Sequence, residues 1–424
     1  MFKFHHFNLA AWLRLWLWIV IAAAASASAQ QTLTWEQVRL RFEQHNPTLL
    51  AGKLNIEESK AEEITAHLRP NPSLGLVVDQ INPFNGGPPH STFGSLLTTA
   101  NASYLHERQH KRELRLESAK EGTAIAVSSQ DDLERNLLFS LRGAFVETLQ
   151  AKAVLNVAKE NLAYYDHVLD ISGERYKAGD IAQIDLDRLE LQRVQFESDL
   201  QTAEVNLRTA RIQLLMLLNE RTPVEQFEVT GPFDFSDQIA PLDDFRKIAV
   251  DTRPDLKAAL QAVDKAKTDH KLALANGSTD PTFGFDVGRN PPIDQYIGFN
   301  VSIPLRIFDR NQGEKLRTQL DIDRNQRLLE AAQTQVFSDV DSAYATLNSN
   351  VTLLRPYKAK YLQQAVHVRE TVTFAYQHGG ASLLDFLSAE NDYRSVQLNY
   401  ANLVGSYLIS ASQLNLAVGR EVIP

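Results

Sequence analysis

The strongest constraint on this chain is that it repeats itself at an interval of 200 residues. Tyr176-x-x-Gly179 and the following Asp185 recur as Tyr376-x-x-Gly379 and Asp385. Three more residues have identical partners at the same offset, namely Glu190 and Glu390, Gln213 and Gln413, and Leu214 and Leu414. A repeat of this kind indicates that the fold is built from two similar halves.

Each copy carries apolar residues at a spacing of seven, which keeps one apolar seam facing a partner helix. The first copy has the row Leu189, Phe196, Ala203, Ala210 and Leu217, beside a row with Leu186, Leu200, Leu207 and Leu214. The second copy has Phe386, Tyr393, Tyr400, Tyr407 and Leu414, beside Ala389, Val396, Leu403, Ser410 and Ala417. The seams predict helix packing and carry no chemistry of their own.

The helices predicted next to these seams are long. No proline occurs from about Gln109 to Arg175, and a continuous helix there would reach about 100 Å at ~1.5 Å per residue. A second long helix is predicted from about Gln312 to Gln377, with Pro356 expected to kink or interrupt it. Each long helix meets the next at a short glycine turn, so we predict two antiparallel helical hairpins.

Each copy also contains a pair of short stretches with alternating polarity. The first copy has an amphipathic helix over about Trp35 to Leu68, followed by strand-like stretches at Ser73–Ile81 and Phe93–Leu105 around a turn-rich loop. The second copy has Thr282–Gly288 and Ile297–Ile303. Alternation over roughly ten residues is typical of transmembrane barrel strands, although hairpins of water-soluble proteins carry the same pattern.

The N-terminus reads as a secretory signal peptide. Lys3 and Arg14 precede the apolar run Leu15–Ala25, and Ala27-Ser28-Ala29 forms a small-residue cleavage site before Gln30. An uncleaved inner-membrane anchor is the alternative. We therefore divide the chain into a signal peptide (1–29), a first repeat (30–219), a linker (220–242), a second repeat (243–419) and a C-terminal tail (420–424).

Composition excludes several classes of function. The chain has no cysteine, which excludes a disulfide framework, a thiolate metal site and a lipid anchor on an N-terminal cysteine. Its formal net charge of −9 gives a nucleic-acid partner no electrostatic support. We find no phosphate-binding loop and no dinucleotide-binding motif, and we expect no cofactor, no resident metal and no enzymatic activity.

An exported chain without a second apolar membrane segment is either periplasmic or part of an outer-membrane barrel. Four strands cannot close a barrel, since the smallest have about eight. Other copies of the chain would then have to supply the missing strands. In such a barrel Asp79, Asp286 and Asn300 would face the pore.

The order of elements resembles the TolC-like outer-membrane efflux protein family. The residues that carry the resemblance are Asn71-Pro72-Ser73-Leu74, Ser302-Ile303-Pro304-Leu305 with Phe308-Asp309-Arg310-Asn311-Gln312-Gly313, and Tyr-x-x-Gly at both turns. The second of these resembles the CzcC-type, heavy-metal cation efflux branch. One departure is Gln109-His110, where the family commonly has two glycines. The resemblance covers about Leu33 to Gly419.

The resemblance implies a mainly α fold with a small β part. Duplicated long helical hairpins would form a periplasmic α-barrel, and four strands per protomer would contribute to a shared 12-stranded outer-membrane β-barrel of a homotrimer. The α-barrel would dock a periplasmic adaptor (membrane fusion protein) and an inner-membrane pump of the RND type. By the same resemblance Gly179, Asp180, Gly379 and Gly380 would lie at the periplasmic tip and contact the adaptor.

The expected function is passive conduction of heavy-metal cations to the exterior. Drugs or other small organic molecules are an alternative cargo for the same channel. A periplasmic coiled-coil scaffold without a pore is a further alternative, but it leaves the paired strands unexplained.

One string suggests an enzyme instead. His106-Glu107-Arg108-Gln109-His110 matches H-E-x-x-H, which on a helix binds zinc in metalloproteases. This alternative needs a helix through the whole motif, a third ligand and a cleft. The string lies where a predicted strand meets a predicted helix, and we therefore rank a zinc metalloprotease last.

Overall fold

The structure is a computed structural model that describes residues 31–81, 96–290 and 293–423. Its tertiary contacts divide the chain into two compact units. The first, here called the hairpin unit, contains residues 31–50, 134–249 and 339–423. The second, the sheet unit, contains Ala51–Leu133 and Val250–Ser338. Each unit therefore takes residues from both repeats.

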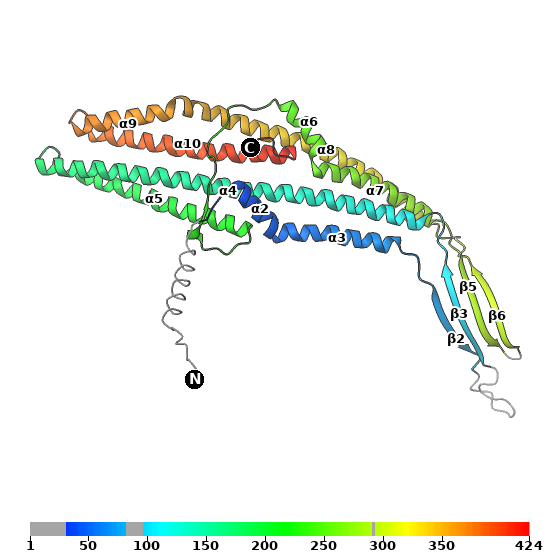
Figure 1. The fold of residues 1–424 in the computed structure, drawn as a ribbon. Helices are drawn as coiled ribbons and strands as arrows, with labels where there is room; N and C mark the ends of the chain where they lie inside the picture. The colour runs from blue at the N-terminus through cyan, green and yellow to red at the C-terminus, as the bar shows by residue number, and fades with distance from the viewer. Residues whose placement is uncertain (1–30, 82–95, 291–292, 424) are drawn as a thin grey trace, which may run out of the picture. The chain divides into compact units, whose positions relative to one another are not determined.

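The long helices form as predicted. Helix α4 runs without a break over Lys111–Ala178, and α5 follows at Gln183–Leu217. In the second copy α8 covers Gln312–Pro356, α9 covers Leu362–Gln377 and α10 covers Leu383–Val418. Within the hairpin unit α4 and α5 run antiparallel, as do α9 and α10 (Figure 1). The mainly helical fold with two long hairpins is confirmed.

The prediction that Pro356 interrupts its helix is confirmed as well. Helix α8 ends at this residue, and a single π-helical segment at Tyr357–Tyr361 joins it to α9. Proline lacks the N–H that an α-helix needs at each interior position, and its ring clashes with the preceding turn. The wider π turn accommodates this without reversing the chain direction.

One predicted helix is two helices. The segment that we expected to be continuous from Trp35 to Leu68 consists of α2 at Trp35–His45 and α3 at Pro47–His67. The break is at Asn46, whose ψ of 117° is extended because a residue before proline avoids the helical region. The Asn46 side chain compensates by accepting a hydrogen bond from Leu49 N at 3.0 Å. The second copy breaks in the same way, with α6 at Leu242–Thr252 and α7 starting at Pro254 and ending at Asn276.

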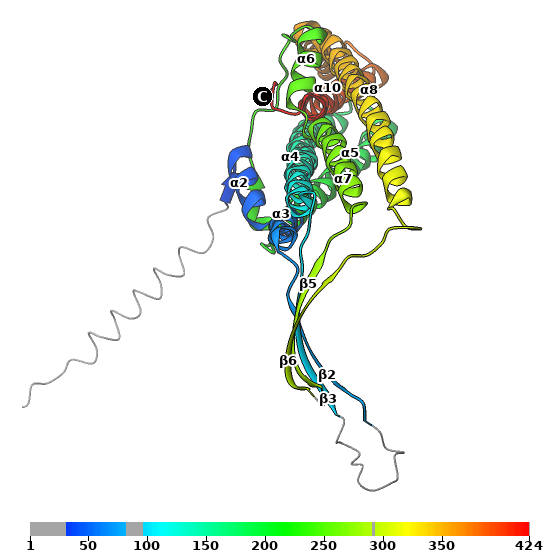
Figure 2. The same cartoon turned by 90° about the vertical axis from the view of Figure 1, so that its right-hand side faces the viewer.

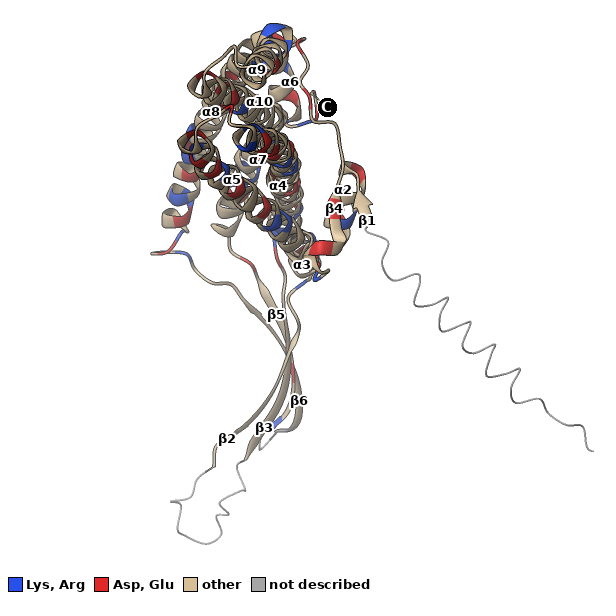
Figure 3. Ribbon diagram, turned by 90° about the vertical axis from the view of Figure 1, so that its left-hand side faces the viewer, with Lys and Arg blue, Asp and Glu red and all other residues tan. Residues whose placement is uncertain are grey.

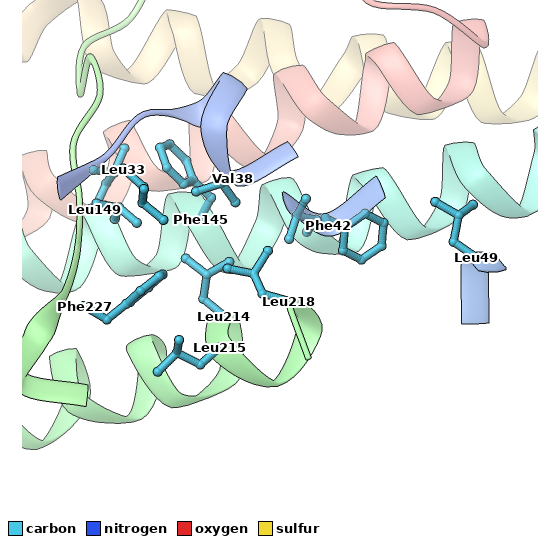
Figure 4. Packing of buried hydrophobic residues seen from close by; sticks show 12 residues of the cluster. Leu33, Val38, Phe42, Leu49, Phe145, Leu149, Leu214, Leu215, Leu218 and Phe227 are labelled. Carbon is cyan, nitrogen blue, oxygen red and sulfur yellow. The ribbon is translucent and has the colours of Figure 1, made fainter. Parts of the chain in front are cut away.

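The core of the hairpin unit gathers side chains from distant parts of the chain (Figure 4). Val38 and Phe42 of α2 pack with Phe145 of α4 and with Leu214 near the end of α5. A short parallel pair of strands, β1 at Gln31–Leu33 and β4 at Phe227–Val229, closes this core. The linker that leads to β4 includes the 3₁₀ turn Val224–Gln226. The sequence did not predict this strand pair, since three residues are too few to show alternation.

The sheet unit contains, within the described residues, one four-stranded antiparallel sheet in the order β2-β3-β5-β6. The strands are β2 at Ser73–Asp79, β3 at Leu97–Leu105, β5 at Thr282–Asn290 and β6 at Ile293–Ser302. Figure 2 shows them twisting together as one ribbon. The pairing of β3 with β5 joins the two repeats, so each copy supplies one hairpin to a common sheet.

Across residues 31–81, 96–290 and 293–423, no helix is both long enough and apolar enough to cross a bilayer.

Candidate functional site

One face of the sheet is apolar and exposed. Residues opposite each other in an antiparallel pair point to the same face, and the register aligns Leu76 with Val287 and Ile297 through Ala100. The next row joins Leu74 to Phe285 and Phe299. Their exposed fractions range from 40% for Phe285 to 84% for Leu74. We call this surface the apolar face; its large members are Leu74, Leu76, Val78, Phe283, Phe285, Val287, Ile297, Phe299 and Val301. The strands carry few charges while the helices carry many (Figure 3).

The opposite face carries mainly small and polar side chains, with Val77 as an exception, and it contains the three predicted pore residues. Asn300 donates from Nδ2 to both carboxylate oxygens of Asp286, at 3.3 and 3.1 Å. Asp79 lies on the same face at the far end of β2, opposite Leu97. Its carboxylate accepts a hydrogen bond from the backbone N–H of Gln80 at 2.7 Å. The sheet therefore brings Asp286 and Asn300 together and leaves Asp79 apart.

This polar face includes residues that the sequence analysis did not select. Asn101 of β3 lies between Gly75 and Asp286 in the register. The Tyr296 hydroxyl lies 2.7 Å from Thr99 Oγ1 across the strands. Thr99, Asn101 and Ser103 alternate along β3, and this alternation is the sequence signal that points to them. A Cβ on Gly284 would lie 2.5 Å from Asn300 Oδ1, so a larger residue there would force the Asn300 side chain to move.

The sheet has two open edges within the described part of the chain. Strand β2 pairs only with β3, and β6 pairs only with β5. Each edge thus presents a row of backbone N–H and C=O groups to which a further strand could hydrogen-bond. An exposed apolar face combined with two free edges is not a stable arrangement in water.

A buried ion pair holds the base of the sheet at the start of α4. Lys111, only 3% exposed, donates to Asp280 Oδ2 at 2.6 Å and to Ser278 O at 3.1 Å. The second oxygen of Asp280 accepts the backbone N–H of Arg108 at 2.9 Å. Burial is the largest single influence on the pKa of Asp280 and raises it, but the hydrogen bonds from Lys111 and Arg108 and the nearby positive charges together lower this pKa. This ion pair links two connecting segments of the sheet unit. One joins β3 to α4, and the other joins α7 to β5.

The two predicted hairpin turns have the same backbone geometry. Gly179 and Gly379 both adopt left-handed conformations, with φ of +85° and +75°. In each turn the backbone N–H of the residue after the glycine donates a hydrogen bond to a carbonyl five residues earlier. Asp180 N donates to Arg175 O at 2.9 Å, and Gly380 N donates to Ala375 O at 2.7 Å. This six-residue closure is the Schellman motif that ends many helices. The structure thus places Gly179, Asp180, Gly379 and Gly380 at the hairpin turns, as predicted.

We expect Gly379→Ala to lower the free energy of unfolding by about 1–2 kcal/mol, because a Cβ opposes the left-handed conformation. Gly143→Ala is the matched control, since neither glycine has a neighbouring atom within 4 Å of an added Cβ. Gly143 lies inside α4, where alanine is favoured by up to about 1 kcal/mol. Denaturant unfolding of both variants tests this, and a loss at Gly143 equal to that at Gly379 would contradict the argument.

The H-E-x-x-H string does not have the geometry of a zinc protease. Helix α4 begins at Lys111, after the motif, and Gln109 and His110 have φ of +61° and +53°. Glu107 is bound by Arg115, whose Nη2 lies 2.9 Å from Oε2. The two imidazoles therefore do not share a helical face. Within the described ranges no group of three or more histidine, aspartate or glutamate side chains could hold a metal ion.

Comparison with known proteins gives a consistent answer. A family model described as "Outer membrane efflux protein" matches residues 41–220 and 246–420. The chain is 22% identical over 385 residues to the cobalt-zinc-cadmium resistance protein CzcC of Cupriavidus metallidurans, covering 88% of this chain and 87% of that protein. It is 25% identical over 324 residues to the pyoverdine export outer membrane protein OpmQ of Pseudomonas aeruginosa, covering 72% and 67%. A solved structure of CusC aligns with a TM-score of 0.77 at 17% identity, covering 92% of this chain and 95% of that one.

Proposed function

The chain belongs to the outer membrane efflux protein family, and from that premise we propose that it is the outer-membrane channel of a tripartite efflux system. It is located in the cell outer membrane and extends into the periplasm. In the proposed system three copies form the channel, a periplasmic adaptor (membrane fusion protein) binds its tip, and an RND-type inner-membrane pump supplies the energy. The chain itself conducts passively and catalyses no reaction.

The observation that carries this proposal is the open sheet with an exposed apolar face. A bilayer tolerates no free sheet edge, because each unpaired backbone group costs several kcal/mol, ~2–7, away from water. If β6 of one copy pairs with β2 of the next, three copies give a closed barrel of 12 strands. Lipid then covers the apolar face, and the polar face with Asp79, Asp286 and Asn300 lines the pore.

The helices support the same assembly. Helix α5 carries an apolar row at multiples of seven residues that remains exposed in the single chain. Ile184, Leu191, Val205 and Ile212 in this row are 57%, 73%, 59% and 50% exposed. Such a row is the pattern of a coiled-coil seam. We propose that it packs against a helix of the neighbouring copy and so extends the ring of helices beyond the barrel.

The glycine turns are proposed as the adaptor contact. Gly179 with Asp180 and Gly379 with Gly380 end the two hairpins in equivalent Schellman turns. Two similar turns in each of three copies would present six nearly equivalent tips. An adaptor that binds such a ring needs to recognise only one kind of turn.

For the cargo we propose heavy-metal cations. The run Phe308-Asp309-Arg310-Asn311-Gln312-Gly313 resembles the CzcC-type branch, and CzcC is a cobalt-zinc-cadmium resistance protein. The carboxylate of Asp286 on the polar face suits cations. OpmQ exports pyoverdine, so small organic molecules are the alternative.

Deleting the gene from the bacterium that carries it should lower tolerance to zinc, cobalt or cadmium. If the deletion lowers tolerance to organic compounds alone, the cargo is a small organic molecule and not a metal cation.

We expect the mature protein to fractionate with the outer membrane and to purify in mild detergent as a particle of three chains. The physical reason is that lipid must cover the apolar face and neighbouring copies must pair both sheet edges. Cell fractionation followed by native mass measurement tests this. A stable water-soluble monomer obtained without detergent would contradict the channel and would favour the periplasmic scaffold.

A further inference from the structure

Glu390 of α10 is the most unusual buried side chain among the described residues. It is 2% exposed, yet neither of its carboxylate oxygens accepts a hydrogen bond. An ionised carboxylate in such a place normally finds a partner or changes its protonation state. Four other residues near the same hairpin ends have a buried atom without a hydrogen bond, namely Ser172 Oγ, Arg369 Nε, Tyr376 Oη and Arg394 Nε.

The charged and titratable groups facing Glu390 come from three helices. Helix α9 contributes Arg369, the attractive charge, and Tyr376 of the same helix interacts with Tyr165. Helix α4 contributes Tyr164 and Tyr165, both of which interact electrostatically with the carboxylate. Tyr165 does not donate a hydrogen bond to the Glu390 carboxylate, because the Tyr165 hydroxyl donates to Leu189 O of α5 at 3.0 Å. The flanking residues on α10 itself are Tyr393 and Arg394.

Arg369 is also committed elsewhere. Its guanidinium carbon lies 3.6 Å from the ring centroid of Tyr393 and 4.1 Å from that of Tyr164. A guanidinium held between two aromatic rings gains cation–π stabilisation from each. It therefore attracts Glu390 at a distance without hydrogen-bonding to it.

Glu390 lies where the two hairpins of the chain pack against each other. Tyr165 and Phe196 of the first hairpin share a core with Tyr376 and Phe386 of the second. Polar links at the same interface are Arg175 Nη1 to Tyr376 O at 2.8 Å and Arg394 Nη1 to Asp199 Oδ2 at 2.6 Å. Ionisation of Glu390 would therefore place a negative charge inside this interface.

We propose that Glu390 is a proton-binding site that controls the packing of the two hairpins near their glycine turns. As a neutral acid it stays in the interface and the hairpins remain packed. Once ionised, it draws water into the interface and α10 separates from α4. The site makes the ends of the hairpins responsive to periplasmic pH.

The direction of the response follows from the burial. Burial raises the pKa of Glu390 to about 7 from an ordinary 4.5, and attraction to Arg369 offsets only part of the effect. The packed state thus binds the proton more tightly than the open state. Its extra stability is complete below about pH 4.5 and is lost as the pH rises through about 7. The hairpins are packed in acid and loosened above neutrality.

The repeat supplies a matched control. Glu190 occupies the equivalent position in the first copy, 200 residues earlier, and is exposed to solvent. The same substitution can therefore remove a carboxylate from a buried position and from an exposed one. Glu390→Gln keeps the shape of the side chain and removes its charge, whereas Glu190→Gln removes a charge that is already solvated.

The test uses spin labels on the full-length purified protein at the two turns. The chain has no native cysteine, so Lys177→Cys and His378→Cys give one label at the end of each hairpin. Labelled chain is diluted with unlabelled chain so that distances within one chain dominate. We expect a single narrow distance at pH 5 and a longer or broader one at pH 8.5, with a midpoint near pH 7.

Two comparisons decide the outcome. Glu390→Gln should keep the narrow distance at both pH values, and Glu190→Gln should respond like the unsubstituted protein. The exposed histidines His167 and His367 remain in both variants, so they cannot cause a difference between the two. A pH response that survives Glu390→Gln, or no response in the unsubstituted protein, overturns the proposal. If Glu390→Gln assembles poorly, Glu390→Leu serves as the second uncharged variant under the same criterion.

Discussion

We expect Phe299→Arg to abolish accumulation of the protein in the outer membrane. Phe299 is 83% exposed on the apolar face of β6, where its ring centroid lies 5.3 Å from that of Phe285. An arginine facing lipid costs about 2–4 kcal/mol near the middle of the bilayer. The proposed trimer contains the substitution three times, so the total approaches about 6–12 kcal/mol, comparable to the whole stability of a typical domain, ~5–15 kcal/mol.

The control for this substitution is its neighbour Asn300→Arg. Asn300 lies on the polar face, where its side chain contacts Asp286. In the proposed barrel an arginine there reaches water in the pore and pairs with that carboxylate, so the protein should still accumulate. Quantifying both variants in outer-membrane fractions is the measurement. Equal accumulation of both variants would mean that the apolar face does not meet lipid.

The sequence predicted the helices well because their signals are local. The seven-residue spacing from Leu189 to Leu217 is visible within one helix and needs no knowledge of the fold. Likewise, Pro356 interrupts its helix for a local steric reason. The break at Asn46 also has a local signal, the proline that follows it. The apolar pattern continues across Asn46, however, and by itself favours one continuous helix. The pairing of β1 with β4 had no local signal, because it joins residues nearly 200 positions apart.

The candidate site was predictable only in part, for the same reason. Alternation placed Asp286 and Asn300 on one face, and the sheet confirms that they are on one face. It did not place Asn101 beside Asp286, since that depends on the order of strands from different repeats. The duplication gives position 190 and position 390 the same residue. Only the packing of one hairpin on the other decides that the second of them is buried.

The second large effect is expected at the ends of the hairpins, from Phe386→Ala. Phe386 is fully buried, and its ring stacks on Tyr376 at 5.1 Å and lies 6.2 Å from Tyr165. Truncating a buried phenylalanine costs about 3–5 kcal/mol through lost burial and the cavity left behind. Because its contacts come from both hairpins, the loss should appear as local opening of their interface before the whole chain unfolds.

Hydrogen exchange of the amides around position 386 in α10 measures that opening. A loss of about 3–5 kcal/mol predicts exchange faster by about a hundredfold to several thousandfold, as long as the amides exchange by local opening. The control is Phe374→Ala on α9, where the ring is 64% exposed in the single chain. It removes the same group without opening a cavity within the chain, so exchange in α10 should stay within a few-fold of the unsubstituted protein. Equal acceleration by both variants would mean that the shared aromatic core does not hold the two hairpins together.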